Sequence, residues 1–403
     1  MTTSNKSDGP APGHTRMGME VSHAAARAVQ QCNVDVVAAY PITPQTHIVE
    51  RLSELVANGE MNAEFVPVES EHSAMSVCVG SSATGARTFT CTSSQGLILM
   101  SEVVYITSAM RLPVVMILAN RSLSGPLSIW ADHSDVMSVR DCGWIQTFAE
   151  NGQEVYDLTF HAYKVAENRD ILHPIMLNLD GFHLTHVVEP IDICDQSIID
   201  KYLPEYEPLF QLHPDKPVTM GAYGVPELFT EAKKNQDEAL KAAYPHILEA
   251  WKEWGDLTGR YYKPVETYKA EGAKTLFLTM GSIGETASVA VDGMQERGED
   301  VGLVKLRLWR PFPFDEVRKA LAGADNVIVL DRALSFGGPG GPVSSEIRAT
   351  LYGLDHAPTV YDYVVGLAGR DVKVDDFEKI ANDVRSGKAR KGQDEYVIYA
   401  ARE

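Results

Sequence analysis

The chain has 403 residues, enough for two or three domains at roughly 100–200 residues each. Its 36 Lys and Arg residues against 55 Asp and Glu residues give a formal net charge of −19, which argues against nucleic acid or an anionic membrane surface as the main partner. A hydrophobic fraction of 44% and a charged fraction of 23% exclude a mainly disordered or fibrous chain.

The N-terminus and the cysteines indicate the compartment. Residues 1–17 are polar and contain Gly and Pro, so we expect a flexible tail without a secretory signal. No apolar stretch reaches the ~18 residues of a transmembrane helix, so membrane insertion is not expected. The five cysteines are too widely spaced for a zinc site or an iron–sulfur cluster held by this chain alone. Their odd number favours reduced thiols and a cytoplasmic location.

Residues 18–200 are predicted to form an α/β domain with a parallel sheet. Short apolar runs predict buried strands, and helical patterns separate them, as in sheets covered on both faces. We expect strands at residues 34–40, 64–68, 87–92, 113–119 and 174–179, and helices at about 20–31, 46–58, 71–84, 97–110 and 151–168.

The remaining residues predict a connector and a second domain. Prolines interrupt residues 185–225, and we expect a connector over 201–270 with one long helix at 227–253. A smaller α/β domain is expected over 271–375, followed by a charged C-terminal tail over 376–403. Its strands are expected at 275–280, 301–306 and 326–330, and its helices near 285–297, 314–322 and 342–352.

In open parallel sheets, ligands bind at the carboxyl ends of strands, so the loops there are the expected site. Thr43 lies between Pro41 and Pro44, where a stiff loop could present its hydroxyl to a ligand, or where Thr43 could simply cap a helix. Glu71 follows the next strand. It is either a charge at a helix N-terminus or a partly buried carboxylate that shares a proton with a ligand nitrogen.

Two further loops carry polar candidates. Ser94 and Gln95 lie at a strand-to-helix turn that offers hydroxyls and backbone N–H groups to a ligand, although the same composition suits any helix start. Arg121 ends the most apolar strand and suits bidentate carboxylate binding. The alternative for Arg121 is an ion pair with Asp132 or Asp135.

No metal site is predicted in this chain. His133 lies between Asp132 and Asp135, where it could bind a metal or act as a base, but a hydrogen-bonded turn is the commoner arrangement. The chain has no G-x-G-x-x-G motif that opens a first βα turn and no G-x-x-x-x-G-K-[ST] motif, so neither a dinucleotide fingerprint nor a P-loop is expected.

Five motifs together resemble the α subunit of 2-oxoacid:ferredoxin oxidoreductases, with pyruvate:ferredoxin oxidoreductase (pyruvate synthase) as the closest member. They are YPITPQT, SEHSA, TSSQGL, ANRSLSGP and DHSDVM, in this order. The later segments MGSIGE, LRLWRPFP and VLDRALSFGGPGGP match the second domain of the same subunit. The resemblance spans most of the chain. It implies a pyrimidine-type thiamine diphosphate domain with a parallel sheet, followed by a transketolase C-terminal-like α/β domain.

The resemblance also implies roles for the loop residues. Glu71 would hydrogen-bond the pyrimidine N1′ of thiamine diphosphate and so promote loss of the thiazolium proton. Arg121 matches the residue that holds the substrate carboxylate, and Thr43 matches the residue that contacts the 2-oxo acid. Ser94 and Gln95 would help to bind the cofactor. The implied reaction is oxidative decarboxylation of a 2-oxo acid, pyruvate above all, to acyl-coenzyme A and CO₂, with electrons passing through iron–sulfur clusters to ferredoxin.

The chain lacks two motifs that the family's reaction requires. The Gly-Asp-Gly string of the family's diphosphate and Mg²⁺ site does not occur, and there are no cluster cysteines. The resemblance therefore implies a hetero-oligomer in which a β subunit shares thiamine diphosphate and supplies Mg²⁺ and a cluster, with γ- and δ-type subunits and ferredoxin as further partners. The alternatives are phenylglyoxylate or 2-oxoglutarate as substrate with another acceptor such as NAD, a non-oxidative thiamine-dependent decarboxylase, and a non-catalytic scaffolding subunit.

Overall fold

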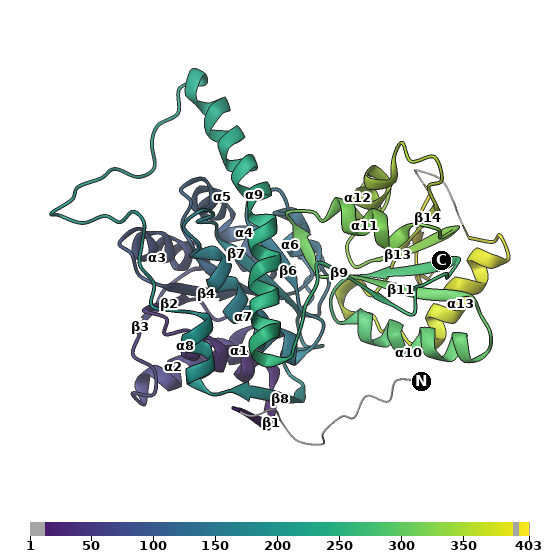
Figure 1. Ribbon diagram of the computed structural model, residues 1–403, viewed down its shortest axis with the longest axis horizontal. Helices are drawn as coiled ribbons and strands as arrows, with labels where there is room; N and C mark the ends of the chain where they lie inside the picture. Colours follow the sequence, from purple (N-terminus) through teal and green to yellow (C-terminus); the bar gives the residue numbers. More distant parts are fainter. Residues whose placement is uncertain (1–12, 390–394, 403) are drawn as a thin grey trace.

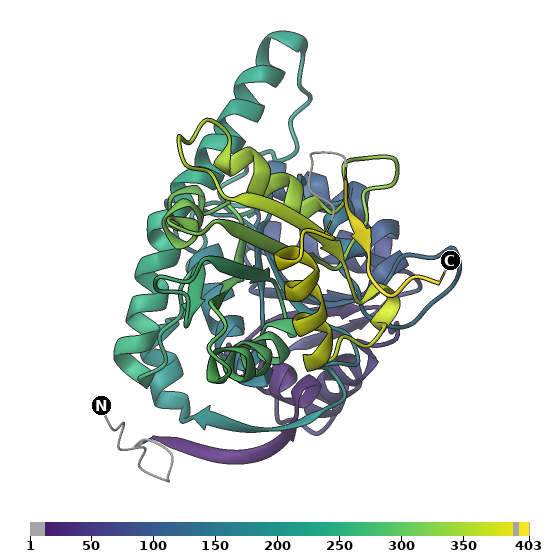
Figure 2. The same cartoon turned by 90° about the vertical axis from the view of Figure 1, so that its right-hand side faces the viewer.

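Two sheets of mostly parallel strands organise the computed structural model, which describes residues 13–389 and 395–402. Figure 1 shows the two α/β units side by side, with the first unit in purple to teal and the second in green to yellow. In Figure 2, the second unit lies in front of the first. The expected α/β class is confirmed.

The first sheet has seven strands in the order β12-β6-β7-β5-β4-β2-β3. All of its pairings are parallel except that of β12, and helices cover both faces, which explains the continuous apolar runs. The strands β2 to β7 are Val36–Ala39, Glu64–Pro67, Thr88–Thr92, Val115–Asn120, Ile145–Phe148 and Ile175–Asp180. β6 was not predicted, because it is a four-residue run in which apolar and polar side chains mix.

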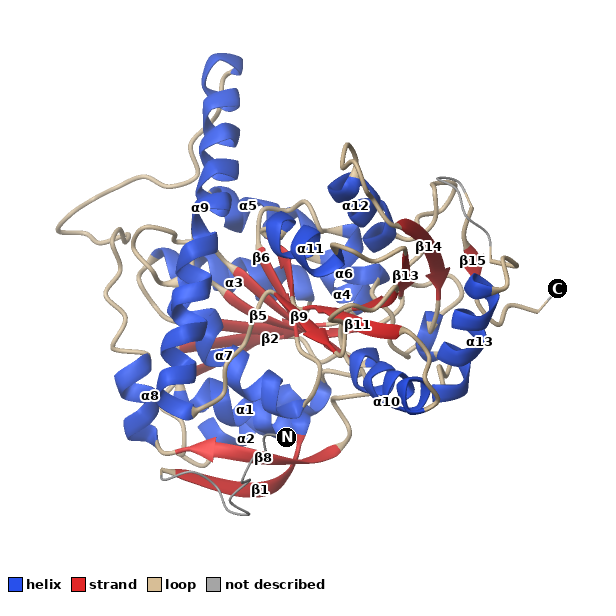
Figure 3. Cartoon of the chain, turned by 45° about the vertical axis from the view of Figure 1, so that its right-hand side comes forward, coloured by secondary structure: helices blue, strands red, loops and turns tan. Residues whose placement is uncertain are grey.

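Helices pack against both faces of this sheet (Figure 3). One face is covered by α1 (Val21–Gln31), α2 (Thr46–Ala57) and α7 (Gly152–Ala166). The other face is covered by α3 (Glu71–Ala83), α4 (Ser94–Leu99), α5 (Ser101–Ala109) and α6 (Ser134–Ser138). The single helix expected over 97–110 is therefore two helices that meet at Met100.

The N-terminal residues correct one prediction. β1 (His14–Glu20) pairs antiparallel with β8 (Val188–Cys194), so residues 14–17 are not a flexible tail, while residues 1–12 of that prediction lie outside the described residues. Backbone pairing holds β1 although most of its side chains are exposed, and a polar sequence gives no signal of such pairing. The short helix α8 (Gln196–Tyr202) follows β8.

The long helix of the expected connector is α9 (Pro226–Thr258), and it extends beyond the predicted 227–253. Its first turns extend beyond the first unit in Figures 1 and 3, Gln236 bonds the Ser108 hydroxyl of α5 at 2.9 Å, and the first buried side chain of the helix is Ala243. The helix ends at Gly259, whose φ of 77° is the left-handed conformation that glycine adopts at helix ends. Among the described residues, none of the helices combines the length and the apolar character needed to cross a membrane.

The second sheet has the order β15-β14-β13-β10-β11-β9, and all of its pairings are parallel except that of β9. Helices α10 and α13 cover one face, and α11 and α12 cover the other. The strands β9, β10, β11, β13, β14 and β15 are Val265–Tyr268, Thr275–Thr279, Val301–Leu306, Asn326–Asp331, Thr359–Val364 and Val397–Ile398. The helices α10 to α13 are Ile283–Glu296, Phe314–Leu321, Pro342–Leu351 and Val374–Arg385, and η1 is Leu367–Gly369.

Three elements of the second unit lie wholly or mostly outside the bounds predicted for that domain, and β14 within those bounds was also not predicted. β9 lies within the expected connector 201–270, while most of α13 and all of β15 lie within the expected tail 376–403. Phe377, Ile380, Ala381 and Val384 of α13 are buried. Their helical spacing builds one apolar face that packs in the core, so this helix belongs to the second unit despite its charged residues.

One strand joins the two units. β12 (Leu308–Arg310) follows β11 of the second sheet but pairs antiparallel with β6 of the first sheet. Arg307, which precedes β12, is 4% exposed and pairs with Glu154 of α7. Backbone pairing and a buried ion pair therefore connect the second unit to the first.

Candidate functional site

The structure gathers the predicted loops at one edge of the first sheet. β3, β2, β4 and β5 are neighbours, and their carboxyl ends lead to Glu71, Thr43, Ser94 and Arg121. Because these strands are parallel, the four residues follow strand ends on the same edge.

Glu71 is the first residue of α3 and is 6% exposed. The preceding Ser70 caps the helix by accepting a hydrogen bond from the Ser73 N–H at 3.2 Å. Within the described residues, the Glu71 carboxylate has no hydrogen-bond or ion-pair partner. Gly96 of α4 lies against it, and a Cβ atom there would come within 2.7 Å of the Glu71 Oε1. The absent side chain at position 96 thus leaves room beside a buried, unpaired carboxylate.

Other buried polar atoms around the end of β4 also lack partners among the described residues. They are the Thr92 hydroxyl, which lies against Gly96, the Ser93 hydroxyl and the Gln45 Oε1. The Gln45 amide donates to the carbonyls of Tyr40 and Cys91 at 2.8 and 3.3 Å, which leaves its oxygen free. Unpaired buried polar atoms are costly, so this set fits a polar ligand that supplies hydrogen bonds.

Ser94 is held inside the fold. It has a positive φ of 48°, its hydroxyl lies 2.6 Å from the Ser122 carbonyl, and its backbone N–H donates to Asp135 at 3.1 Å. The same hydroxyl lies 2.6 Å from the Gln95 Oε1. Ser94 therefore shapes the turn, while cofactor binding by Ser94 and Gln95 stays a prediction.

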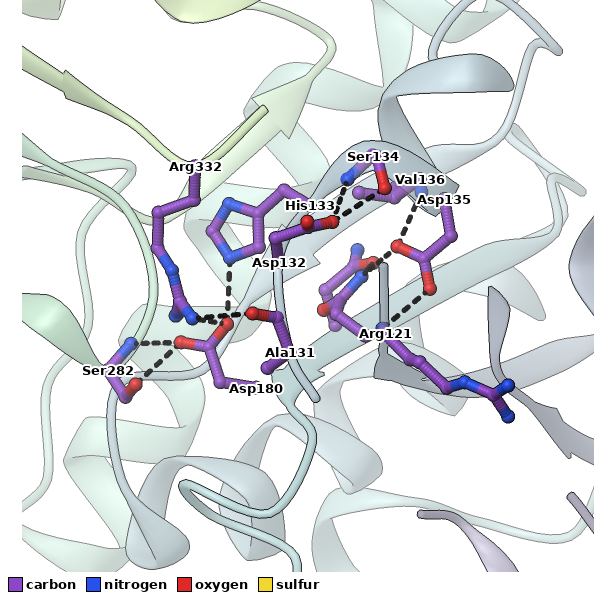
Figure 4. A network of polar contacts seen from close by, with 12 residues as sticks. Arg121, Ala131, Asp132, His133, Ser134, Asp135, Val136, Asp180, Ser282 and Arg332 are labelled. Atoms are coloured by element: carbon purple, nitrogen blue, oxygen red, sulfur yellow. Dashed lines mark hydrogen bonds and ion pairs between the residues drawn. The ribbon is translucent and has the colours of Figure 1, made fainter. Parts of the chain in front are cut away.

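The Arg121 side chain is 6% exposed and points away from Asp135 (Figure 4). Its Nε donates to the Ser128 carbonyl at 2.8 Å, and its Nη1 donates to the Thr43 carbonyl at 2.9 Å. No described carboxylate pairs with the guanidinium, so the alternative of an ion pair with Asp132 or Asp135 is wrong. Nη2 has no partner among the described residues. Burial lowers the pKa of Arg121, and Asp135 opposes this change.

Thr43 is exposed and does not cap a helix. α2 begins three residues later, at Thr46, and Gln45 occupies the N-cap position without a side-chain bond. The Thr43 carbonyl orients Arg121, so the loop that presents the Thr43 hydroxyl is tied to the arginine of the neighbouring loop.

Asp135 is a fully buried carboxylate that joins two of these loops. It accepts the backbone N–H groups of Arg121, Ser94 and Val136 at 2.9, 3.1 and 2.8 Å and the side-chain amide of Asn120 at 3.0 Å. Burial raises the pKa of Asp135 to about 7, although these donors favour the charged form. The sequence analysis considered Asp135 only as a partner of the Arg121 side chain, because a sequence does not show which backbone groups a carboxylate accepts.

His133 belongs to a hydrogen-bonded network rather than to a metal site. Its Nε2 lies 2.8 Å from the Asp180 Oδ1, and both side chains are buried. The described residues contain no group of His, Cys, Asp or Glu side chains that could hold a metal ion. Burial alone would raise the pKa of Asp180, but Arg332 and His133 hold it well below its usual value. His133 lies directly before α6, and its side chain bonds across to the end of β7.

Two family models match the chain, one over most of the first α/β unit and one over most of the second. The model of the family "Pyruvate flavodoxin/ferredoxin oxidoreductase, thiamine diP-bdg" matches residues 27–252, and that of "Pyruvate:ferredoxin oxidoreductase core domain II" matches residues 273–377. Pyruvate synthase subunit PorA of Methanocaldococcus jannaschii is 47% identical over 364 residues, which cover 90% of this chain and 92% of the relative. The chain belongs to the PorA family. The Thermotoga maritima PorA is 43% identical over 95% of this chain and 97% of its own length.

The PorA-family chain has a further relative with a different name. Ketoisovalerate oxidoreductase subunit VorA of Pyrococcus horikoshii is 43% identical over 92% of this chain and 94% of its own length. The identity to VorA therefore equals that to the Thermotoga PorA.

Two solved structures share the fold of this PorA-family chain. A 2-oxoglutarate:ferredoxin oxidoreductase from Magnetococcus marinus, with 2-oxoglutarate, coenzyme A and succinyl-CoA bound, matches with a TM-score of 0.65 at 20% identity. The match covers 93% of this chain and 65% of that chain. A split-gene transketolase, an inactive beta4 tetramer, matches with a TM-score of 0.52 at 14% identity and covers 92% of this chain and 99% of that chain. The expected α/β fold with a thiamine diphosphate-binding domain is confirmed.

The raised pKa of Asp135 predicts a pH-dependent effect of Asp135→Asn. Folding raises the pKa of this carboxyl from 3.8 to about 7, so the native state binds more protons than the unfolded state between these values. The stability that this group contributes is therefore greatest at low pH and is lost as the pH rises through this window. We expect the melting temperature of the wild type, minus that of the variant, to fall between about pH 4.5 and about pH 7.5.

The exposed Asp170 offers a control, because Asp170→Asn should give a difference that stays constant with pH. A constant difference for Asp135→Asn as well would contradict the prediction.

Proposed function

We propose that this PorA-family chain is the subunit of a 2-oxo acid oxidoreductase that binds the pyrimidine half of thiamine diphosphate and the carboxylate of the substrate. The reaction is the oxidative decarboxylation of a 2-oxo acid, with pyruvate as the main substrate, to acyl-coenzyme A and CO₂, and ferredoxin accepts the electrons. The observation that carries this proposal is the buried Glu71 carboxylate, which has no partner among the described residues and faces the space beside Gly96.

The residues beside Glu71 fit the pyrimidine ring of thiamine diphosphate. A buried carboxyl group can share a proton with a ring nitrogen, and the unpaired Thr92, Ser93 and Gln45 atoms offer further polar contacts. Ser94 and Gln95 shape the adjacent turn and would contact the ring. When bound, thiamine diphosphate supplies the nucleophilic carbon and the electron sink of the reaction. Glu71 holds the proton at the pyrimidine N1′, and its burial excludes competing water.

Arg121 and Thr43 fit a 2-oxo acid. Two backbone carbonyls fix the guanidinium and leave Nη2 available to a substrate carboxylate. The chain has a net charge of −19, so its overall electric field repels an anionic substrate. The buried Arg121 cation attracts such a substrate locally. The exposed Thr43 hydroxyl lies on the loop that orients Arg121 and contacts the same substrate.

A β subunit completes the cofactor site. The chain has no Gly-Asp-Gly string, and its five cysteines are all free and buried, so the diphosphate, Mg²⁺ and iron–sulfur clusters belong to partner chains. Exposed apolar side chains on α4 and α5, next to the site, support a protein partner there: Ile98, Leu99, Tyr105 and Ile106. The γ- and δ-type subunits, coenzyme A and ferredoxin complete the reaction, and the free thiols support a cytoplasmic location.

The VorA relative favours a second candidate substrate, a branched-chain 2-oxo acid such as 2-oxoisovalerate. Both candidates use the same carboxylate and cofactor contacts and differ only in the side chain of the substrate. Coenzyme A-dependent viologen reduction by the assembled enzyme, with pyruvate, 2-oxoisovalerate and 2-oxoglutarate compared by kcat/KM, distinguishes them.

Glu71→Gln tests the function. The variant keeps the size of the side chain but removes the proton acceptor, so turnover of the assembled enzyme should fall by roughly 10²-fold or more. The matched control is Glu69→Gln, because Glu69 is a nearby carboxylate that bonds the Ser73 hydroxyl. Control turnover should stay near that of the wild type. If Glu71→Gln keeps near wild-type turnover, Glu71 is not the catalytic carboxylate. If Glu69→Gln loses turnover instead, Glu69 has that role.

Arg121→Lys and Arg121→Ala test the substrate anchor. Lysine keeps the charge but loses the planar geometry, so KM for the 2-oxo acid should rise in the Lys variant. In the Ala variant, kcat/KM should fall by about 10- to 100-fold, as expected for a lost charge-assisted hydrogen bond. Arg51→Ala is the control, because Arg51 makes a surface i,i+3 pair with Glu54. An unchanged KM for Arg121→Ala, with only a lower melting temperature, would rule out the anchor.

A further inference from the structure

The Arg121 guanidinium depends on a loop whose two ends are joined. The backbone N–H of Ser122 donates to the Trp130 carbonyl at 3.0 Å, which closes the loop directly after Arg121. Within the loop, the Ser128 carbonyl accepts the Arg121 Nε–H at 2.8 Å. The position of the guanidinium is therefore set by where this closed loop lies.

The residues that follow the loop are bonded to the second α/β unit. The Ala131 carbonyl accepts hydrogen bonds from the Gly369 N–H at 2.6 Å and from the Arg332 Nη2 at 3.1 Å. The His133 N–H donates to the Arg332 carbonyl at 2.8 Å. Arg332 thus contacts this segment through both its side chain and its backbone.

Asp132 adds a second link between the units. Its Oδ2 accepts the Ala368 N–H of the second unit at 3.0 Å, while its Oδ1 accepts the Ser134 hydroxyl at 2.6 Å. The Ser134 hydroxyl in turn accepts the Leu123 N–H at 2.9 Å, inside the loop that holds Arg121. Asp132 therefore transmits the position of η1 to the start of the same loop.

Asp180 is the buried centre of these contacts (Figure 4). Its Oδ1 accepts the Arg332 Nη1 at 2.7 Å and lies 2.8 Å from the His133 Nε2, and its Oδ2 accepts the Ser282 N–H and hydroxyl at 2.8 and 2.6 Å. Asp180 ends β7, whereas Ser282 and Arg332 follow β10 and β13. The carboxyl ends of the two sheets therefore meet at one carboxylate.

The segment 131–135 contacts both the second unit and the candidate site. Asp132 and His133 bond to the second unit, and Asp135, only two residues after His133, accepts the backbone N–H groups of Arg121 and Ser94. We propose that the second α/β unit sets the position of the Arg121 guanidinium, and that Arg332 is the positioning residue through which it does so. This inference rests on the proposed role of Arg121 as substrate anchor.

Arg332 is bonded at the contact between the two units. It is 5% exposed, and its guanidinium is engaged by Asp180 and by the Ala131 carbonyl. Its effect on the reaction must therefore pass through the loop. Loss of the guanidinium should shift Arg121 and weaken substrate binding, while contacts to coenzyme A stay unchanged.

The test compares Arg332→Ala and Arg332→Lys in the assembled enzyme. We expect Arg332→Ala to raise KM for the 2-oxo acid by roughly 10-fold or more, as for a displaced binding group, with KM for coenzyme A unchanged. Arg332→Lys should rescue part of this rise, because lysine keeps the ion pair with Asp180 but cannot also reach the Ala131 carbonyl. Arg370→Ala is the matched control, because Arg370 is an exposed arginine of the same unit.

A purely structural role gives a different result. Both Arg332 variants would then lose melting temperature while KM for the 2-oxo acid stayed at the wild-type value, and this result would overturn the inference. If the Arg332→Ala enzyme does not assemble, Arg332→Lys and Ser282→Ala test the inference. Each removes one contact of the network and should still raise KM for the 2-oxo acid. Unchanged KM in both would overturn the inference.

Arg121→Ala, measured in parallel, separates this inference from the proposed function. If Arg121→Ala raises KM and the Arg332 variants do not, only the positioning role is wrong. If Arg121→Ala itself leaves KM unchanged, the anchor and the positioning role are both wrong.

Discussion

One buried carboxylate, Asp135, holds together the two loops on which the site depends. Burying a charge is costly unless hydrogen bonds replace its hydration, and Asp135 meets this condition with four N–H donors. Two of the donors are the backbone groups of Ser94 and Arg121, which follow neighbouring strands. The Ser94 turn and the Arg121 backbone are therefore fixed relative to each other by one buried group.

The negative charge of Glu71 and the positive charge of Arg121 are not paired with each other. Glu71 is buried without a partner among the described residues, and Arg121 is buried with only carbonyl partners. Neither side chain neutralises the other or any described neighbour, so each keeps its capacity for a ligand. In the proposed function, a cofactor nitrogen and a substrate carboxylate supply the complementary groups. The second α/β unit contacts the first at Asp180, through Arg332 and Ser282.

Sequence patterns predicted the elements whose own residues carry a strong periodic signal. The apolar runs of β2, β4, β5 and β7 indicated a parallel sheet, and the loops after the strands located Thr43, Glu71, Ser94 and Arg121. β1, β6 and β12 were missed because their stability comes from pairing with distant strands. α13 was missed because its charged residues masked four buried apolar positions.

The contacts within the site were less predictable than its residues. The predicted alternative for Arg121 was an ion pair with an acidic side chain, but the guanidinium binds the carbonyls of Ser128 and Thr43. Every residue has a carbonyl, so the residue type gives no information on such contacts. The role of Asp135 was hidden for the same reason, since its main partners are backbone N–H groups. Only the three-dimensional arrangement of the loops determines which backbone groups are within reach.

The most direct measurement is a high-resolution structure of the assembled enzyme with thiamine diphosphate and a 2-oxo acid bound. The account predicts that the substrate carboxylate lies within hydrogen-bond distance of the Arg121 Nη2 and that the Glu71 carboxylate bonds the pyrimidine N1′. It also predicts that Arg121 keeps its bonds to the Ser128 and Thr43 carbonyls. A substrate carboxylate held by another cation, or a pyrimidine ring away from Glu71, would contradict the account.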